Sequence, residues 1–346
     1  MKIVETTKAV GQVLCHDLTQ IIRGEKKGPA FRKGHIVTEE DIPILLSMGK
    51  DHLYVWENNE NMIHENEAAQ ILFDLCAEKG MDHSEIKEGK IEILADRDGL
   101  LKVDREKLYK VNHLGDMMNA VRHGDLPVKK GEKLAGTRII PLVIEKEKME
   151  QAKKAAFGGS ILKILPFHPK KTAIVTTGNE VFYGRIQDTF GPVVREKVAE
   201  YSCEVIGQTY CDDQKEHITE AIQKFVEDGA ELILCTGGMS VDPDDCTPGA
   251  IRDTGAQIVT YGAPVLPGAM LLLAYLRNKE GKAVTIVGLP GCVMYAKRTI
   301  FDLVLPRIIA DDLIKKEELD ALGEGGLCLN CEICHFPNCG FGKGRM

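Results

Sequence analysis

From residue 172 onward, short apolar runs alternate with longer segments in which apolar residues recur at helical spacing. The runs are typical of buried strands, and the longer segments are typical of amphipathic helices. Strands are expected at residues 172–177, 204–210, 231–236 and 283–287, with a weaker one at 257–261. Helices are expected at residues 188–201, 214–227 and 294–309, with a short one from Thr247. This alternation predicts right-handed βαβ units and a mostly parallel sheet.

The pattern before residue 169 is less regular and predicts a smaller α+β region of one or two submodules. Helices are expected at residues 42–48, 65–79, 105–121 and 145–156, and strands at 52–56 and 139–144. Residues 91–94 and 100–103 flank Asp98-Gly99, a combination that is typical of a β-hairpin. The predicted domains are therefore residues 1–168, an α/β domain at 169–322 and a tail at 323–346.

Charge and hydropathy narrow the class of protein. The 346 residues carry 44 Lys and Arg against 52 Asp and Glu, a net charge of −8. A nucleic-acid binder would show a basic footprint, so this charge argues against that class. No apolar run reaches the roughly 18 residues of a membrane helix, and the first residues show no signal-peptide core. We therefore expect a cytoplasmic protein with reduced thiols and with neither nucleic-acid nor membrane partners.

Each expected parallel strand is followed by a loop that carries glycine, hydroxyl or carboxylate groups. These loops cover residues 177–180, 211–213, 236–247 and 288–291. In a doubly wound sheet, ligands bind outside the carboxyl ends of the strands. Because all four loops belong to that end of the sheet, they predict one ligand site.

The residue types in the loops point to a phosphorylated ligand. Glycine lets backbone N–H groups approach a phosphate, and a helix that starts at Thr247 directs its N-terminus toward negative charge. The carboxylates of Glu180, Asp213 and Asp245 suit a bridging Mg²⁺ or hydrogen bonds to ring amino groups. A phosphorylated heterocycle with a divalent cation satisfies both requirements. Asp245 has the alternative role of a simple N-cap near Thr247.

The order and spacing of these motifs carry a resemblance to a known family. The matching pieces are Thr177-Gly-Asn-Glu-Val, Gly184-Arg-Ile-x-Asp188, Asp212-Asp213, Thr236-Gly-Gly-Met-Ser, Asp245-x-Thr247, Leu266-Pro-Gly268 and Gly288-Leu-Pro-Gly291. Residues 172–310 thereby resemble the molybdopterin-binding domain of molybdenum-cofactor biosynthesis proteins. The resemblance implies a three-layer α/β/α sandwich that binds a pterin with a terminal phosphate.

The resemblance also implies roles for individual residues. It assigns functional or catalytic roles to Glu180, Asp212, Asp213 and Asp245, and a place in the phosphate region to Ser240. The implied cofactor-binding residues are Thr177, Gly178, Asn179, Thr236, Gly237, Gly238, Met239, Ser240, Thr247, Pro267, Gly268, Gly288, Pro290 and Gly291.

Within the family, the arrangement is similar to a molybdopterin molybdotransferase, which inserts molybdate into the pterin dithiolene. This implies molybdopterin, Mg and molybdate or tungstate as ligands, a cofactor-accepting enzyme as partner, and a homo-oligomer. Two positions depart from the family pattern: Met270 stands where a second proline is usual, and Cys292-Val293 replace a common Asn-Pro. The tail also stands where the family commonly has a further β-rich domain.

The tail holds four of the 11 cysteines, in the spacing Cys328-x2-Cys331-x2-Cys334-x4-Cys339. Pairs of the form Cys-x2-Cys suit tetrahedral Zn²⁺. The first three cysteines also match the start of a ferredoxin run, although the last gap is four rather than three. We expect Zn²⁺ or an Fe–S cluster at these four residues, with His335 as an alternative ligand and an unmetallated tail as the remaining possibility.

Three functions are compatible with the sequence. The first is insertion of molybdate or tungstate into molybdopterin. The second is a non-catalytic carrier or sensor of the cofactor that docks on a partner through the cysteine tail, which Met270 and Cys292 favour. The third is a pyrophosphatase-type use of the same domain on a nucleotide.

Overall fold

The computed structural model describes residues 2–22, 26–55 and 61–344, and the chain divides into two compact units. Unit 1 comprises Met1–Asp96, Val103–Arg122 and Lys130–Lys163, and unit 2 comprises Arg97–Lys102, His123–Lys129 and Ile164–Met346. Trp56, where the sequence predicts the end of a strand, lies outside the described residues. Among the described residues, no helix has both the length and the apolar character that crossing a bilayer requires.

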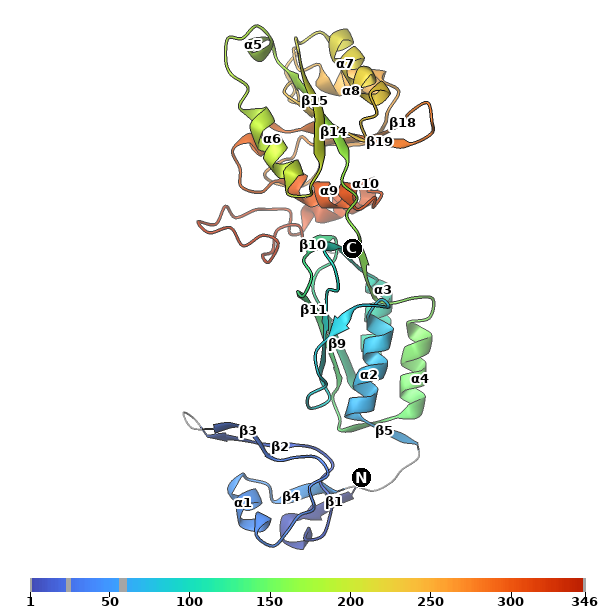
Figure 1. Cartoon of the computed structure of the whole chain (residues 1–346), viewed down its shortest axis with the longest axis vertical. Helices are drawn as coiled ribbons and strands as arrows, with labels where there is room; N and C mark the ends of the chain where they lie inside the picture. The colour runs from blue at the N-terminus through green and yellow to red at the C-terminus, as the bar shows by residue number, and fades with distance from the viewer. Residues whose placement is uncertain (1, 23–25, 56–60, 345–346) are drawn as a thin grey trace. The chain divides into compact units, whose positions relative to one another are not determined.

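A six-stranded sheet in the order β15-β14-β16-β19-β18-β17 forms the middle of unit 2 (Figure 1). Its strands are β14 (Lys171–Thr177), β15 (Glu204–Cys211), β16 (Leu232–Thr236), β17 (Gln257–Tyr261), β18 (Leu272–Arg277) and β19 (Ala283–Leu289). Neighbouring strands β15, β14, β16 and β19 pair in parallel, whereas β18 is antiparallel to both of its neighbours. The predicted, mostly parallel sheet is therefore confirmed.

Helices cover both faces of this sheet, because its strands bury side chains on both sides. Ala173 and Val175 of β14 pack with α7 (Lys215–Glu227) and α8 (Thr247–Asp253) in one core cluster. Ile174, which points the other way, packs in a second cluster with α6 (Phe190–Ala199) and α9 (Ile300–Ile309). The three-layer α/β/α sandwich expected from the resemblance is confirmed.

The remaining elements of unit 2 are short and lie mainly in loops and in the C-terminal segment. They are α5 (Asn179–Phe182), η2 (Gly291–Met294), α10 (Lys316–Asp320) and η3 (Ala321–Gly323). The expected helix at 294–309 begins only at Ile300, because Thr299 forms a capping box with Asp302 and sets the helix start there.

Unit 1 mixes short strands with helices, as the predicted α+β region requires. Its first part contains β1 (Lys2–Glu5), η1 (Thr6–Lys8), β2 (Leu18–Ile22), β3 (Lys26–Phe31), α1 (Asp41–Ser47) and β4 (His52–Val55), which share one apolar core. The following elements are β5 (Met62–His64), α2 (Glu65–Cys76), β6 (Asp82–His83), β7 (Ile91–Leu94), β8 (Gly99–Val103), α3 (Arg105–His113), β9 (Met117–Val121), β10 (Leu126–Val128), β11 (Lys133–Ile139), β12 (Val143–Glu145), α4 (Lys146–Ala155) and β13 (Leu162–Leu165). Of these, β8, β10 and β13 form their own three-stranded sheet, which belongs mostly to unit 2: all of β10, β8 up to Lys102 and β13 from Ile164.

The predicted hairpin at residues 91–103 is wrong in its pairing, although both strands exist. Strand β7 pairs with β6 and β11, whereas β8 pairs with β10 and β13. A side chain at Gly99 would overlap the carbonyl oxygen of Leu165 in β13. The glycine at this position therefore serves close packing between β8 and β13, and not a tight turn between β7 and β8.

Two other predicted elements in this region have wrong bounds. The helix expected at 105–121 ends at His113, after which Asp116 takes a left-handed backbone conformation with φ 58°. The chain then continues as β9, which pairs with β11. The strand expected at 139–144 is split between the end of β11 and the start of β12.

Candidate functional site

The carboxyl ends of β14, β15, β16 and β19 lie at the same edge of the sheet, because these strands are parallel neighbours. A cavity of about 510 Å³ opens at this edge. Of the predicted site residues, it is lined by Gly237, Gly238, Met239, Ser240, Asp245, Gly268, Pro290 and Gly291. The loops after β16 and β19 and the loop before β18 thus meet around one hollow.

The loop after β16 requires glycine at two successive positions. Gly237 has φ 86°, and a side chain there would overlap the carbonyl oxygen of Thr177. Gly238 has φ 55°, and its added Cβ would stand 2.7 Å from Thr247 Oγ1. Only glycine meets both conditions without strain. This backbone therefore packs directly against the two threonines behind it.

Three of the predicted cofactor-binding residues lie behind the cavity wall. Thr177, Thr236 and Thr247 are buried. Thr177 Oγ1 and Thr247 Oγ1 are 3.0 Å apart, and Thr247 Oγ1 donates to the carbonyl of Gly237 at 2.9 Å. These hydroxyls hold the glycine loop in place and do not face the cavity. Gly288 likewise contacts Met239 from inside the sheet, where an added Cβ would stand 2.6 Å from the sulfur.

The carboxylates predicted as catalytic fall into different environments. Asp213 Oδ2 accepts a hydrogen bond from Asn179 N at 3.0 Å. Burial raises the pKa of Asp213, and the nearby charges of Glu180, Asp244 and Asp212 act in the same direction. Glu180 folds back over Gly178, where an added Cβ would stand 2.7 Å from its Oε1. The structure therefore brings Asp213, Glu180 and Asp244 together beside the β14 and β15 loops.

Asp212 is engaged in holding the start of α7. Its Oδ1 interacts with His217 Nδ1 at 2.8 Å and accepts from Gln214 N at 3.2 Å, and its Oδ2 accepts from Gln214 Nε2 at 3.0 Å. Burial acts against ionisation, but the hydrogen bonds from His217 and Gln214 leave the pKa of Asp212 below its ordinary value. Asp212 and Asp213, although adjacent in sequence, thus face different partners.

Asp245 lines the cavity, and its Oδ2 accepts from Asp242 N at 3.1 Å. The alternative interpretation of Asp245 as an N-cap is wrong, since Cys246 occupies the cap of α8 and no side chain caps that helix.

The two departures from the family pattern both reach this cavity. Met270 and Cys292 line it together with Met239 and Met294. Thr189 Oγ1 donates to Met294 Sδ at 3.0 Å, and burial raises the pKa of the Cys292 thiol. The cavity therefore has sulfur-bearing side chains on several sides.

Two residues that support the cavity were not predicted as site residues. The Tyr261 hydroxyl donates to the carbonyls of Met239 at 2.9 Å and Ser240 at 3.1 Å. Asp188 Oδ1 accepts from the backbone N–H groups of Phe190 and Gly191 at 2.9 Å, and Phe190 lines the cavity. The motif that contains Asp188 signalled its importance, but no sequence pattern pointed to Tyr261.

The four tail cysteines line a second cavity of about 520 Å³, separate from the first. Pro267, predicted to bind the cofactor, lines this second cavity, whereas its neighbour Leu266 lines the first. Within the ranges that the structure describes, no three His, Cys, Asp or Glu side chains converge on a point where they could hold a single metal ion. The tail cysteines therefore share a cavity without forming a single-ion site.

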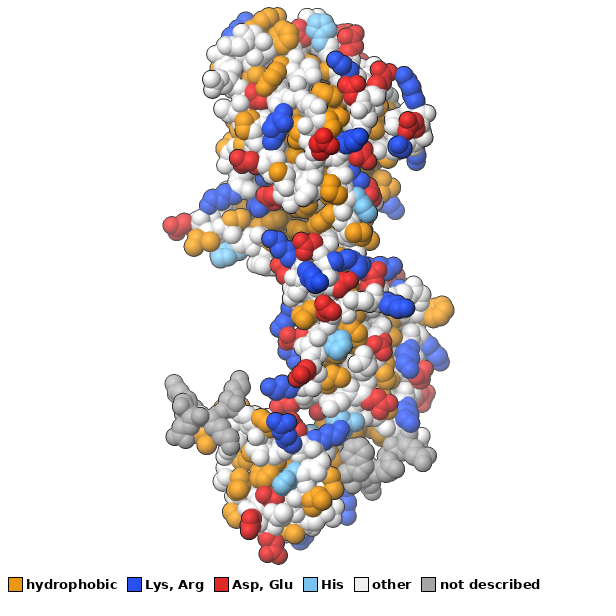
Figure 2. All heavy atoms as spheres, in the orientation of Figure 1, with side chains coloured by type: hydrophobic (Ala, Val, Ile, Leu, Met, Phe, Trp, Pro, Cys, Tyr) orange, Lys and Arg blue, Asp and Glu red, His pale blue; other side chains and the backbone are white. Residues whose placement is uncertain are grey.

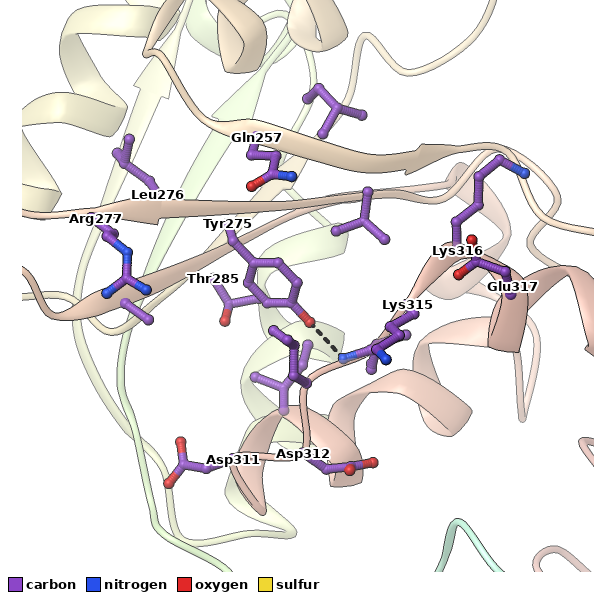
Figure 3. Close-up of a pocket in the computed structure, with 16 residues that line it drawn as sticks. Gln257, Tyr275, Leu276, Arg277, Thr285, Asp311, Asp312, Lys315, Lys316 and Glu317 are labelled. Carbon is purple, nitrogen blue, oxygen red and sulfur yellow. Dashed lines mark hydrogen bonds between the residues drawn. The ribbon is translucent and has the colours of Figure 1, made fainter.

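A further cavity of about 520 Å³ lies at the opposite edge of the sheet (Figure 3). It involves Thr285 near the start of β19 and Arg277 at the end of β18. The Tyr275 hydroxyl accepts from Ile314 N at 3.0 Å, as the dashed line in Figure 3 shows. Its two aspartates are engaged elsewhere, Asp311 with Lys170 and Asp312 with Arg307. This cavity has no glycine loop and is not the predicted site.

Comparisons with known proteins agree with this geometry. Residues 173–310 match the family described as a probable molybdopterin binding domain, and residues 3–57 match a domain of unknown function. The chain is 27% identical over 125 residues to the molybdopterin molybdenumtransferase of Synechococcus elongatus, covering 34% of this chain and 31% of the relative. It is 33% identical over 90 residues to a CinA-like protein of Mycobacterium tuberculosis, covering 26% and 21%. The chain thus spans less than a third of the length of either relative.

Among solved structures, the chain is similar to the tungsten cofactor synthesizing protein MoaB from Pyrococcus furiosus. The identity is 19%, the TM-score is 0.32, and the match covers 36% of this chain and 84% of that one. The family match spans the six-stranded sheet of unit 2, apart from the first two residues of β14, and every residue that lines the first cavity. Residues 173–310, which form this sheet and the loops around the cavity, are therefore the part of the chain that is similar to the probable molybdopterin binding domain.

Proposed function

We propose that this protein binds molybdopterin in the cavity at the carboxyl ends of the strands and inserts molybdate or tungstate into it with the help of Mg²⁺. The family match of residues 173–310 supports the ligand, and the glycine loop at the cavity wall supports its position. The domain would then carry out one step of molybdenum-cofactor biosynthesis.

The glycine loop suits the terminal phosphate of the pterin. Gly237 and Gly238 have no side chains that would keep an anion from their backbone, and Ser240 adds a hydroxyl at the same wall. Tyr261 donates to the carbonyls of this loop and so fixes its orientation before a ligand arrives. Successive backbone N–H groups in such a turn form a concavity for an anion.

The carboxylates suit Mg²⁺ only when the ligand contributes. The described side chains form no protein-only metal site. Mg²⁺ is ordinarily held by one or two carboxylates together with substrate phosphates. Asp245 lines the cavity, and Asp213 and Glu180 stand beside the neighbouring loop. A bound Mg²⁺ would neutralise charge between these groups and the ligand phosphate.

The test is a reconstitution with metal-free molybdopterin, Mg²⁺ and molybdate or tungstate. We expect the purified protein to bind the pterin and to produce a cofactor that activates an apo-molybdoenzyme. Asp245→Asn should lower the rate of conversion while pterin fluorescence still reports binding. Tight pterin binding without conversion by the wild type would exclude the insertion activity and leave the binding activity.

A carrier function is the second candidate, and two observations favour it. Met270 and Cys292 change the cavity wall relative to the family pattern. Leu327, Leu329 and Ile333 of the tail are 62%, 78% and 70% exposed, and hydrophobic side chains are visible on the surface there (Figure 2). Exposed apolar groups in one segment are a feature of docking surfaces.

A transfer assay separates the two candidates. A carrier loaded with finished cofactor should pass it to an apo-molybdoenzyme, and replacing Leu329 and Ile333 by serine should slow that transfer without changing cofactor affinity. Hydrolysis of a nucleotide by the purified protein would instead support the pyrophosphatase-type use of the domain. Size measurements in solution will test the proposed homo-oligomer.

A further inference from the structure

We infer that the cavity lined by Cys328, Cys331, Cys334 and Cys339 binds a [4Fe–4S] cluster through these four thiolates. All four side chains line the same cavity of about 520 Å³. The structure forms no disulfide among the described cysteines. This site is distinct from the pterin cavity, and its occupancy does not depend on the proposed function.

The tail is a built part of unit 2. Phe341 is 3% exposed and belongs to the core cluster that contains α9. A side chain on Gly342 would overlap Leu303 of α9, and one on Gly326 would overlap the carbonyl oxygen of Pro264. The segments before and after the cysteines are therefore fixed against the domain, and the four thiols are confined to one region.

Backbone hydrogen bonds hold the start of the tail beside the pterin loop. Leu266 N donates to Gly326 O at 2.8 Å, and Cys328 N donates to Leu266 O at 2.8 Å. Cys328 and Cys339 also pack against the core cluster, whereas Cys331 and Cys334 are exposed. Two thiols thus pack against the core of the domain, and two lie at the exposed side of the cavity.

The charge around the cavity suits an anionic group. Lys297 and Arg298 line it, and none of its described lining residues is Asp or Glu. Lys297 Nζ donates to Glu332 O at 2.7 Å, and the Arg298 guanidinium lies 5.3 Å from the centre of the Phe336 ring. Four thiolates around a cluster carry net negative charge, which Lys297 offsets, whereas Arg298 is already paired with Asp302 and Glu200. Phe336 and Phe341 line the cavity with apolar rings.

The spacing of the cysteines along the sequence favours a cluster over a single zinc ion. Zn–S bonds of about 2.3 Å place tetrahedral sulfurs about 3.8 Å apart. In a [4Fe–4S] cluster each thiolate binds a different iron, so the thiolates surround a larger body. The sequence Cys328-x2-Cys331-x2-Cys334 also reproduces the first two ligand spacings of a ferredoxin run.

The experiment is anaerobic purification of the full chain, followed by reconstitution with ferrous iron and sulfide under reducing conditions. We expect about four irons and four acid-labile sulfides per chain, in line with the proposed cluster. A broad absorption band in the visible range should bleach on reduction with dithionite. About one zinc per chain without sulfide, two irons per chain, or no bound metal would each overturn the assignment.

Two variants make the test specific. Cys331→Ser with Cys334→Ser changes only the exposed ligands, so the fold should remain, as circular dichroism and thermal unfolding can verify. This double variant should retain less than a tenth of the iron of the wild type. Cys76→Ala, which removes a buried thiol of unit 1, is the control and should retain full iron content. Equal iron content in the double variant and the control would contradict the proposal.

Discussion

Gly237 and Gly255 have nearly the same backbone but different surroundings, which makes them a matched pair. Their φ angles are 86° and 84°. Nothing lies within 4 Å of a Cβ placed on Gly255, whereas one on Gly237 would overlap the Thr177 carbonyl oxygen. Alanine at either position incurs left-handed strain of about 1–2 kcal/mol.

We therefore predict a larger loss of stability for Gly237→Ala than for Gly255→Ala, together with loss of pterin binding only in the former. Urea unfolding and pterin fluorescence titration measure the two quantities. Equal effects of the two substitutions on both measurements would show that the close approach to Thr177 has no consequence.

The raised pKa of Asp213 predicts that the stability of the folded state depends on pH. Burial, with help from Glu180, Asp244 and Asp212, raises the pKa of Asp213 in the folded state. The folded state therefore holds the proton more tightly than the unfolded state, so this group contributes less stability as pH rises past its unfolded pKa of about 3.9. The difference between the melting temperature of Asp213→Asn and that of the wild type should accordingly increase, in favour of the variant, from pH 4 to pH 7.

If Asp213 takes part in binding Mg²⁺ together with the pterin, Mg²⁺ should reduce the difference in melting temperature between Asp213→Asn and the wild type. Melting curves recorded with pterin, with and without Mg²⁺, provide the measurement. Parallel stability curves for wild type and Asp213→Asn over the whole pH range would contradict the raised pKa.

The sequence predicts which loops form the site, but it does not predict the direction in which each side chain points. The run Asp212-Asp213 suggested two equivalent carboxylates. In the structure, Asp212 interacts with His217 and Gln214, whereas Asp213 accepts a hydrogen bond from Asn179. Successive residues leaving a strand point to opposite sides, and which of the two faces the site depends on the helix that follows. No single sequence carries that information.

At the scale of elements, the start of α9 anchors the site. Asp302 Oδ1 accepts from Lys197 Nζ at 2.7 Å and from Arg298 Nη1 at 2.8 Å, and its Oδ2 accepts from Thr299 N at 2.7 Å. Lys197 and Asp302 are both buried. Ile300 N donates to Pro267 O at 3.1 Å, which ties this helix start to the loop between the two cavities.

We predict that Asp302→Ala lowers the free energy of unfolding by about 3–5 kcal/mol, because it leaves the Lys197 ammonium buried without its partner. Asp320→Ala is the control, since it breaks an exposed pair with Lys316 and should change stability by less than about 1 kcal/mol. Chemical denaturation of both variants makes the comparison. A loss for Asp302→Ala no greater than that of the control would contradict the anchoring role.

The success of the sequence predictions differs between the two units for a physical reason. The strands and helices of unit 2 alternate along the chain and pair mostly with near neighbours, so periodicity alone located β14, β15, β16 and β19. In the earlier part, β7 and β8 are consecutive but join different sheets. Local pattern shows that a strand exists, but its partner is set by packing with distant residues such as Leu165.

At the scale of the whole molecule, the two units have separate apolar cores. One core lies around α1 and β4 in unit 1, and two clusters lie on the faces of the sheet in unit 2. The predicted boundary at residue 168 treats the units as consecutive segments and stays a prediction. Separate cores allow separate unfolding transitions.

We predict that calorimetry shows more than one unfolding transition. Molybdopterin should raise the melting temperature of only the transition that belongs to unit 2. A ligand that binds the folded state stabilises it by about 2.7 kcal/mol at a hundred times its dissociation constant. Scans at several pterin concentrations give the measurement. A shift of every transition by the same amount would show that the units unfold together.

The discontinuous make-up of unit 2 determines which fragments of this protein are worth producing. Leu126, contributed by the segment His123–Lys129, is 3% exposed within the core cluster around α9. Lys102, from Arg97–Lys102, pairs with Asp312 at 2.9 Å. No single cut of the polypeptide therefore yields the complete pterin-binding unit, and an expression fragment that starts at residue 164 would carry an uncovered apolar surface. Fragment design for crystallography or screening should start before residue 97.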